Sequence, residues 1–209
     1  VGLIDNVKVN KDPNLSTLAL WHLDEEINGS CADGKDVCDA YGRFNGTVVG
    51  TEITPTNEGY GRSFDGSTSS KVDFGDLSEF EIQNLSVEAV IKLDGTCMLG
   101  HCTIFGKGST TNQGFSMSIR NQRLEARIND GRLGQIATGS TNIDYGTWYH
   151  VGASFDTENR LILLYLNGQL EGVIDLWEPI NYLDQTVRIG TSNTGNDLTF
   201  NGVIDEVRV

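Results

Sequence analysis

The chain has 209 residues, with 25 glycines but only 3 prolines, and a formal net charge of −14. This length suits a single all-β domain, since such domains often reach about 200–250 residues, and abundant glycine is typical of short strands joined by tight turns. The acidic charge argues against nucleic acid as a partner, because phosphate binding needs clustered lysine and arginine. The sequence has no run of about 18 apolar residues, so it predicts no helix inserted in a membrane.

Alternation of apolar and polar residues predicts β-strands along nearly the whole chain and no helix. The predicted strands are, in chain order, 18–23, 45–49, 70–74, 85–93, 103–107, 114–120, 124–129, 134–138, 148–156, 160–166, 170–175, 186–189 and 202–209. Asn167-Gly168 is the strongest hairpin-turn signal, and Asn121-Gln122 is predicted to join two further strands. This pattern predicts an all-β fold, a two-sheet antiparallel jelly-roll sandwich.

The two ends of the chain carry similar sequences. Residues 2–9 read GLIDNVKV, and residues 202–209 read GVIDEVRV. One interpretation is coincidence between two amphipathic strands. The other is that residues 1–16 hold the last strand of a preceding copy and a linker, so that the domain spans 17–209 within a tandem array. Adjacent copies of the domain would then be partners of this one.

The four cysteines form two close pairs, Cys31 with Cys38 and Cys97 with Cys102. Neither spacing fits the Cys-x2-Cys pattern of zinc sites, although His101 beside Cys102 leaves zinc as the alternative. Two local disulfides are therefore predicted. Disulfides persist in oxidising compartments, so we expect an extracellular or cell-surface protein.

A series of short motifs follows in a fixed order from residue 18 to the end of the chain. They are LALWHLDEE at 18–26, DAYGRFNGTV at 39–48, GYGRSFDGSTSSKVDF at 59–74, LSVEAVIKL at 85–93, GTWYHVGASFD at 146–156, LYLNGQLEG at 164–172, VRIGTS at 187–192 and FNGVIDEVRV at 200–209. Together they resemble the laminin G-like domain of the concanavalin A-like lectin/glucanase superfamily. Val90 departs from the family pattern, which usually has tryptophan there. The resemblance implies a jelly-roll sandwich with one concave sheet, and an accessory role in glycan binding, adhesion or spacing.

The resemblance also implies a structural calcium ion (Ca2+) where the first and last strands meet. Calcium takes about 6–8 oxygen ligands, commonly carboxylates together with backbone carbonyls and water. Asp205 in the closing strand and Asp24 after the first strand are the expected ligands, and Asp39 and Asp65 are weaker candidates. The alternative is that Asp205 accepts backbone N–H bonds or pairs with an arginine.

Aromatic and polar residues in loops and hairpins are the candidates for ligand binding. Sugar-binding sites stack aromatic rings on the ligand and bind its hydroxyls through amides, carboxylates and arginines. Trp177 lies in the predicted loop DLWEPINY with Tyr182 close by, and is either a stacking platform or a cap on the core. Arg120, Arg127 and Asn129 lie in the most basic hairpin, which either meets an acidic glycan or forms a solvated face.

No arrangement of residues predicts catalysis. Glucanases of this superfamily need two carboxylates on one strand face, and no acidic pair in a predicted strand shows that spacing convincingly. His22 and His150 lie in apolar strands and are expected to be buried, as are Trp21 and Trp148. The main hypothesis is a glycan-binding or adhesive module whose partner is a glycan or another surface protein. The alternatives are a structural repeat of a surface filament, sheath or fibre, and a divergent glycoside hydrolase.

Overall fold

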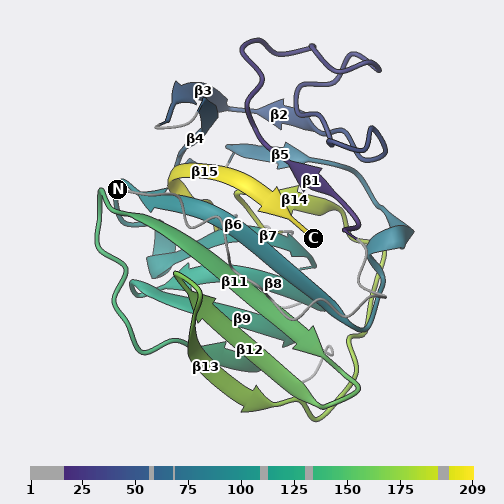
Figure 1. Cartoon of the computed structure of the whole chain (residues 1–209), viewed down its shortest axis with the longest axis vertical. Coiled ribbons are helices and arrows are strands. Elements are labelled where there is room, and N and C mark those ends of the chain that lie inside the picture. The colour runs from purple at the N-terminus through teal and green to yellow at the C-terminus, as the bar shows by residue number, and fades with distance from the viewer. Residues whose placement is uncertain (1–16, 57–58, 68, 109–112, 130–133, 193–197) are drawn as a thin grey trace.

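A computed structural model describes residues 17–56, 59–67, 69–108, 113–129, 134–192 and 198–209. This part of the chain forms two antiparallel sheets, and its helical structure consists of two single turns, η1 (Ser78–Phe80) and η2 (Met98–Gly100) (Figure 1). The prediction of an all-β, two-sheet sandwich is therefore confirmed. The predicted strand and linker within 1–16 lie outside the described residues.

The larger sheet has eight strands in the described part of the chain. They are β1 (Leu20–Trp21), β3 (Thr51–Pro55), β4 (Tyr60–Asp65), β6 (Leu85–Leu93), β11 (Trp148–Asp156), β12 (Leu161–Leu166), β13 (Gln169–Asp175) and β15 (Asn201–Arg208). Their order is β13-β12-β11-β6-β15-β4-β3, and β1 also pairs with β15. The closing strand β15 thus lies inside the sheet, between β6 and β4.

The smaller sheet has seven described strands. They are β2 (Thr47–Val49), β5 (Lys71–Asp73), β7 (His101–Lys107), β8 (Gly114–Arg120), β9 (Arg123–Asn129), β10 (Gln135–Thr138) and β14 (Val187–Ile189). Their order is β10-β9-β8-β7-β14-β5-β2. The outermost strands β10 and β13 of the two sheets therefore lie at the same side of the sandwich, where contacts between them join the sheets.

Strand β6 illustrates how the sequence pattern builds the core. Buried and half-buried residues alternate along its whole length, as expected for a strand with one face inside the sandwich. Trp21 is fully buried among the rings of Phe74, Phe80 and Phe105, with centroids 4.4–6.1 Å apart. This packing anchors the short strand β1 beside β15.

Strands β3 and β4 were missed by the sequence analysis. In β4, Arg62 takes an inward position on the same strand face as Phe64, and both side chains are buried. The guanidinium of Arg62 donates to Asn28 Oδ1 at 2.7 Å and to the carbonyl of Asp36 at 2.9 Å. Because arginine occupies a core position, the apolar alternation that identifies a strand is absent from the sequence.

The predicted hairpins and disulfides are present. Asn167 and Gly168 have φ values of 49° and 77°, as a type I′ turn requires. Asn121-Gln122 connects β8 to β9 in the same way, with φ values of 49° and 61°. Cys31–Cys38 and Cys97–Cys102 are disulfides with Cα atoms 5.4 and 5.3 Å apart, which fits an oxidising compartment.

Neither of the two helical turns in the described residues has the length and apolar character that a membrane-spanning helix needs.

Candidate functional site

A cleft opens at one side of the sandwich, between the edge strands β10 and β13. Its volume is about 530 Å³, within the range of small-molecule sites. The described residues that line it are Gly134, Gln135, Val173, Ile174, Asp175 and Trp177. The two walls therefore come from different sheets, and the cleft exists only because the sheets meet here.

Trp177 is the aromatic residue of this cleft, and 77% of it is exposed. Its backbone N–H donates to Gln135 Oε1 at 2.5 Å, which ties the segment after β13 to the start of β10. The preceding residue, Leu176, is buried, and its N–H donates to the carbonyl of Arg160 at 2.8 Å. The backbone is thus anchored while the indole ring faces solvent, an arrangement that favours a stacking platform over a cap on the core.

Glu171 joins the two edge strands toward the other end of β13. Its carboxylate accepts hydrogen bonds from the N–H of Ser140 at 2.6 Å and from both the N–H and the hydroxyl of Thr141. Gly172 lies against β10, since a Cβ on Gly172 would be 3.1 Å from the carbonyl oxygen of Thr138. The cleft is therefore bounded by contacts at both ends.

Tyr182 does not share the exposed position of Trp177. Its hydroxyl donates to the carbonyl of Ile82 at 2.6 Å, and its ring meets Phe115 edge-on with centroids 6.4 Å apart. Burial raises the pKa of Tyr182. These contacts place Tyr182 at the margin of the core, where its hydroxyl is already engaged.

The basic hairpin consists of β8 and β9, which are buried along both faces except at the turn and so do not form a solvated face, and an acidic side chain accompanies its charges. Arg127 and Asn129 are buried, and Arg127 Nη2 lies 3.1 Å from Glu125 Oε1. Arg120 is half-exposed, and its Nη1 lies 4.0 Å from Glu125 Oε2. A Cβ on Gly134 would be 2.5 Å from Asn129 Oδ1 and 3.5 Å from Arg127 Nη1. Asn129 and Arg127 thus lie directly behind one wall of the cleft.

A second hollow, of about 260 Å³, lies beside the Cys97–Cys102 disulfide. Its described lining includes Asn121, Gln122 and the half-exposed Tyr145, and no charged side chain. Gln122 Nε2 donates to the carbonyl of Ile143 at 3.3 Å, so that amide is partly engaged. This hollow is smaller than the edge cleft, and its aromatic residue, Tyr145, is less exposed than Trp177.

The candidate metal site lies where β1 meets β15, which run side by side in Figure 1. The two strands are antiparallel, so the residues that follow β1 lie beside the middle of β15. His22 Nδ1 is 2.8 Å from Glu206 Oε1, and Asp24 is close enough for its charge to act on Asp205. The structure places Asp24, which is exposed, and Asp205, which is buried, at the same strand junction, but among the described residues no three potential metal ligands lie within 4.8 Å of one another there.

Asp205 has a buried carboxyl group in acidic surroundings. The residue is 8% exposed, and its Oδ1 accepts the N–H of Glu206 at 2.9 Å. Burial, and then the charges of Glu206 and Asp24, raise the pKa of Asp205 to about 7. Asp24 in turn accepts the N–H of Tyr60 at 2.7 Å. Two neighbouring carboxylates of this kind are oxygen donors suited to a hard cation.

The two weaker metal candidates lie in other settings. The carboxylate of Asp39 accepts three backbone N–H groups at 3.0–3.3 Å, which is a structural role. Asp65 accepts the N–H of Ser67 at 2.8 Å in an exposed turn, and hydrogen bonds from Ser67 lower its pKa. Asp65 in β4 is the cross-strand partner of Asn201 in β15. Asn201 lies four residues, or about 13 Å, along β15 from Asp205. Neither residue joins the pair at the strand junction.

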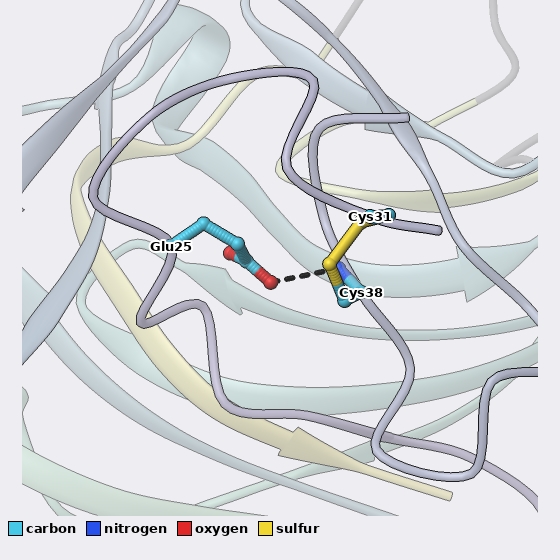
Figure 2. Close-up of side chains that lie close together, drawn as sticks. All are labelled: Glu25, Cys31 and Cys38. Carbon is cyan, nitrogen blue, oxygen red and sulfur yellow. Dashed lines mark hydrogen bonds between the residues drawn. A yellow bond between two sulfur atoms is a disulfide. The ribbon is translucent and has the colours of Figure 1, made fainter. Parts of the chain in front are cut away.

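Figure 2 shows another group of potential ligands, Glu25, Cys31 and Cys38, whose ligand atoms lie within 4.8 Å of one another. The two sulfur atoms form a disulfide, so they offer no thiolate to a metal. Glu25 Oε1 accepts the N–H of Cys38 at 2.7 Å, and Glu25 Oε2 lies 3.7 Å from Arg62 Nη2. This group therefore holds an acidic loop over the buried arginine.

The histidines are distributed differently from the prediction. His22 lies just beyond the end of β1 and its side chain is 48% exposed, so the expectation of a core residue is wrong. His150 is half-buried, with its Nε2 3.1 Å from Glu88 Oε2. The buried histidine is His101, whose Nε2 is 2.9 Å from Ser118 Oγ and whose pKa burial lowers to about 4.

The tryptophans also differ from one another. Trp21 fills the core as predicted. Trp148 does not, because it stands on the outer face of the larger sheet beside its cross-strand partner Lys92. Lys92 Nζ lies 5.6 Å from the centre of the Trp148 ring, a cation–π contact. A period of two in a strand does not show which of its faces points inward.

Two cleft residues, Gln135 and Asp175, were not predicted. They lie in strands of different sheets, separated by 40 positions in the chain. No local motif marks either of them. Asp175 lies two positions before Trp177, so the neighbourhood of this loop tryptophan is a sequence signal that could have found it. Gln135 has no such signal.

The comparison with protein families covers most of the chain. A family model described as "Concanavalin A-like lectin/glucanases superfamily" matches residues 65–209. The chain belongs to this superfamily. The resemblance drawn from the motif series is thereby confirmed, and the matched region includes β15 and the residues that line the cleft.

Several solved structures share this superfamily fold. Domain 4 of AbnA, a GH43 extracellular arabinanase from Geobacillus stearothermophilus in complex with arabinotriose, is 19% identical with a TM-score of 0.69, covering 92% of this chain and 91% of that one. The CBM40 of Ruminococcus gnavus IT-sialidase bound to alpha2,3 sialyllactose is 16% identical with a TM-score of 0.51, covering 61% and 75%. The receptor binding domain of botulinum neurotoxin type G is 15% identical with a TM-score of 0.65, covering 93% and 47%. At these identities the likeness establishes the fold. The search of curated proteins returned no significant match.

Proposed function

We propose that the chain is a non-catalytic glycan-binding module of a secreted or cell-surface protein. The observation that carries the proposal is the exposed Trp177 beside the edge cleft. An indole ring left in water on an anchored backbone is suited to stack on the apolar face of a sugar ring. The arabinotriose and sialyllactose complexes of two structural neighbours support the same class of ligand.

The remaining cleft residues supply hydrogen-bonding groups. Asp175 presents a carboxylate that accepts bonds from hydroxyls, and the carboxamide of Gln135 offers N–H donors while its oxygen holds the N–H of Trp177. Asn129 and Arg127 support this wall from behind Gly134. A sugar stacked on Trp177 therefore has polar partners from both sheets.

Binding to a panel of polysaccharides and oligosaccharides tests the proposal. Trp177→Ala should lose at least about fivefold in affinity, since aromatic contacts of this kind contribute on the order of 1 kcal/mol or more beyond the area they bury. Ile27→Ala is the matched control, because Ile27 is 68% exposed and belongs to the loop after β1, on the side of the molecule away from β13 (Figure 1). Binding that survives Trp177→Ala but is lost in Tyr145→Ala would place the site at the smaller hollow instead. Release of reducing sugar by the purified protein would contradict the non-catalytic assignment.

We also propose that Asp24 and Asp205 hold a structural calcium ion. The proposal rests on the burial of the Asp205 carboxyl group and on the position of both residues at the junction of β1 and β15. Backbone carbonyls and water would complete the 6–8 oxygen ligands that calcium takes. Such an ion would tie the closing strand to the start of the domain, so calcium should raise the melting temperature and a chelator should lower it.

A second candidate function is favoured by the repeated sequences GLIDNVKV and GVIDEVRV at the two ends of the chain. On this proposal the domain is one unit of a tandem array in a surface filament, sheath or fibre, and its contacts are with adjacent copies. A protein with two linked copies tests it. Unfolding of the pair at a higher denaturant concentration than the single domain supports contact between copies, and identical unfolding argues against it.

A further inference from the structure

We infer that the edge cleft between β10 and β13 selects neutral saccharides and rejects those that carry carboxylate or sulfate groups. The inference rests on the proposed function, because it names the class of ligand for the same cleft. It comes from the charges and hydrogen-bonding groups that line and back the cleft.

The charged side chain in the described lining of the cleft is acidic. Asp175 lines it together with Gln135 and Trp177, and no lysine or arginine is among the described lining residues. A sugar carboxylate stacked beside Trp177 would approach the Asp175 carboxylate. Two like charges at close range repel, and the surrounding net charge of −14 adds to the repulsion.

Two arginines of the described residues lie near the cleft, and neither offsets this charge inside it. Arg127 lies behind Gly134, is buried, and pairs with Glu125 at 3.1 Å. Arg160 precedes β12, whose first residue pairs with Asp175, but Arg160 does not line the cleft. Among the described residues, an anionic ligand would therefore lose hydration without gaining a cationic partner in the cleft lining, which is a net cost.

The hydrogen-bonding groups of the cleft match hydroxyls. Within the described chain, β10 pairs with β9 alone and β13 with β12 alone, so each presents an outer edge without a sheet partner. Edge strands carry backbone N–H and C=O groups in equal number. A sugar hydroxyl both donates and accepts. Together with the N–H donors of Gln135 and the acceptor oxygens of Asp175, these edges suit an uncharged polyol.

Matched neutral and acidic probes test the inference. Arabinotriose and lactose are compared with trigalacturonate and 3′-sialyllactose by titration calorimetry at low and physiological salt. We expect the neutral probe that binds best to exceed every acidic probe by about tenfold or more, with little dependence on salt, because its binding involves no net charge.

Charge variants locate the selectivity. Asp175→Lys should reduce or invert the preference for the neutral probe, by about tenfold in the ratio of affinities. Glu52→Lys is the matched control, because it makes the same change in net charge on β3, at the opposite edge of the larger sheet, and should leave the ratio unchanged. A ratio that changes equally in both variants would assign selectivity to the overall charge and overturn the role of the cleft.

The outcomes separate this inference from the proposed function. Acidic probes that bind as tightly as neutral ones, with binding lost in Trp177→Ala, would overturn neutral selectivity and leave glycan binding intact. If Arg160→Gln then abolished the acidic binding, Arg160 would be the anion receptor. Absence of binding to every saccharide would overturn the proposed function and this inference together.

Discussion

Substitution of Asp205 by asparagine tests the junction of β1 and β15 through the dependence of stability on pH. Burial and neighbouring negative charges raise the pKa of Asp205 to about 7 in the folded protein, against about 3.9 in an unfolded chain. Between these two values the folded state binds more protons than the unfolded state. The free energy of unfolding therefore falls as the pH rises from about 4 to about 7 in the absence of metal.

The magnitude follows from the width of this window. At about 1.4 kcal/mol per pH unit, ionisation of Asp205 destabilises the metal-free fold by at most about 4 kcal/mol. Asparagine keeps nearly the same volume and can accept the N–H of Glu206, but it has no charge. With chelator present, the Asp205→Asn variant should be more stable than the wild type at pH 8 and should differ little from it at pH 5.

Calcium should reverse the order of stability at pH 8, so that the wild type becomes more stable than Asp205→Asn. An ion bound between Asp24 and Asp205 stabilises the wild type at pH 8 by about 2.7 kcal/mol when its concentration is a hundred times the Kd. The variant lacks one of the two carboxylates and should gain much less. Asp65→Asn is the control, since Asp65 lies in an exposed turn away from the junction and should respond to calcium as the wild type does.

Urea unfolding followed by tryptophan fluorescence at pH 5, 6, 7 and 8, with EDTA or calcium, measures these differences. His22 contributes in the same direction, because its hydrogen bond with Glu206 raises its pKa and that stabilisation is lost as the pH rises above about 6.5. Wild type and Asp205→Asn both keep His22, but the charge of Asp205 also helps to raise the pKa of His22, so their difference reports Asp205 together with this smaller coupling. Equal pH dependence of the two proteins would refute the reasoning about burial, and equal stabilisation by calcium would refute the ligand assignment.

Three further predictions concern stability alone and are measured by urea or thermal unfolding. Arg62→Ala should cost about 3–5 kcal/mol, because it leaves a buried acidic partner without its cation; a loss under 1 kcal/mol would contradict that. Cys31→Ser combined with Cys38→Ser should cost about 2–3 kcal/mol, as expected for a short closed loop, and reducing agent should then have no further effect through this pair. Gly190→Ala should cost more than Gly146→Ala, since both have positive φ but the new Cβ would lie 2.1 Å from a phenylalanine ring at Gly190 and meet nothing within 4 Å at Gly146. Equal losses of stability in the two variants would show that the positive φ, and not the steric contact, determines the cost of the substitution.

Local patterns were sufficient to predict most strands and the class of fold. The alternation in β6 and the Asn167-Gly168 turn depend on neighbours in sequence, and the structure shows both as predicted. The close spacing of the cysteine pairs likewise led to the disulfides. The motif series pointed to the superfamily that the family comparison establishes. The strands, turns and disulfides depend on residues close to one another in sequence, and the superfamily resemblance depends on the order of such local motifs, so the sequence carries both directly.

The tertiary structure alone decided which strand faces and edges meet. Arg62 occupies a core position because a distant acidic loop supplies its partners, so β4 could not be recognised from apolar alternation. Gln135 and Asp175 form one cleft because the edges of two sheets close on each other. Trp177 is exposed beside this cleft, whereas Arg127, one of the arginines of the basic hairpin, is buried next to Gly134. Such contacts arise from long-range packing, whose partners no local pattern specifies.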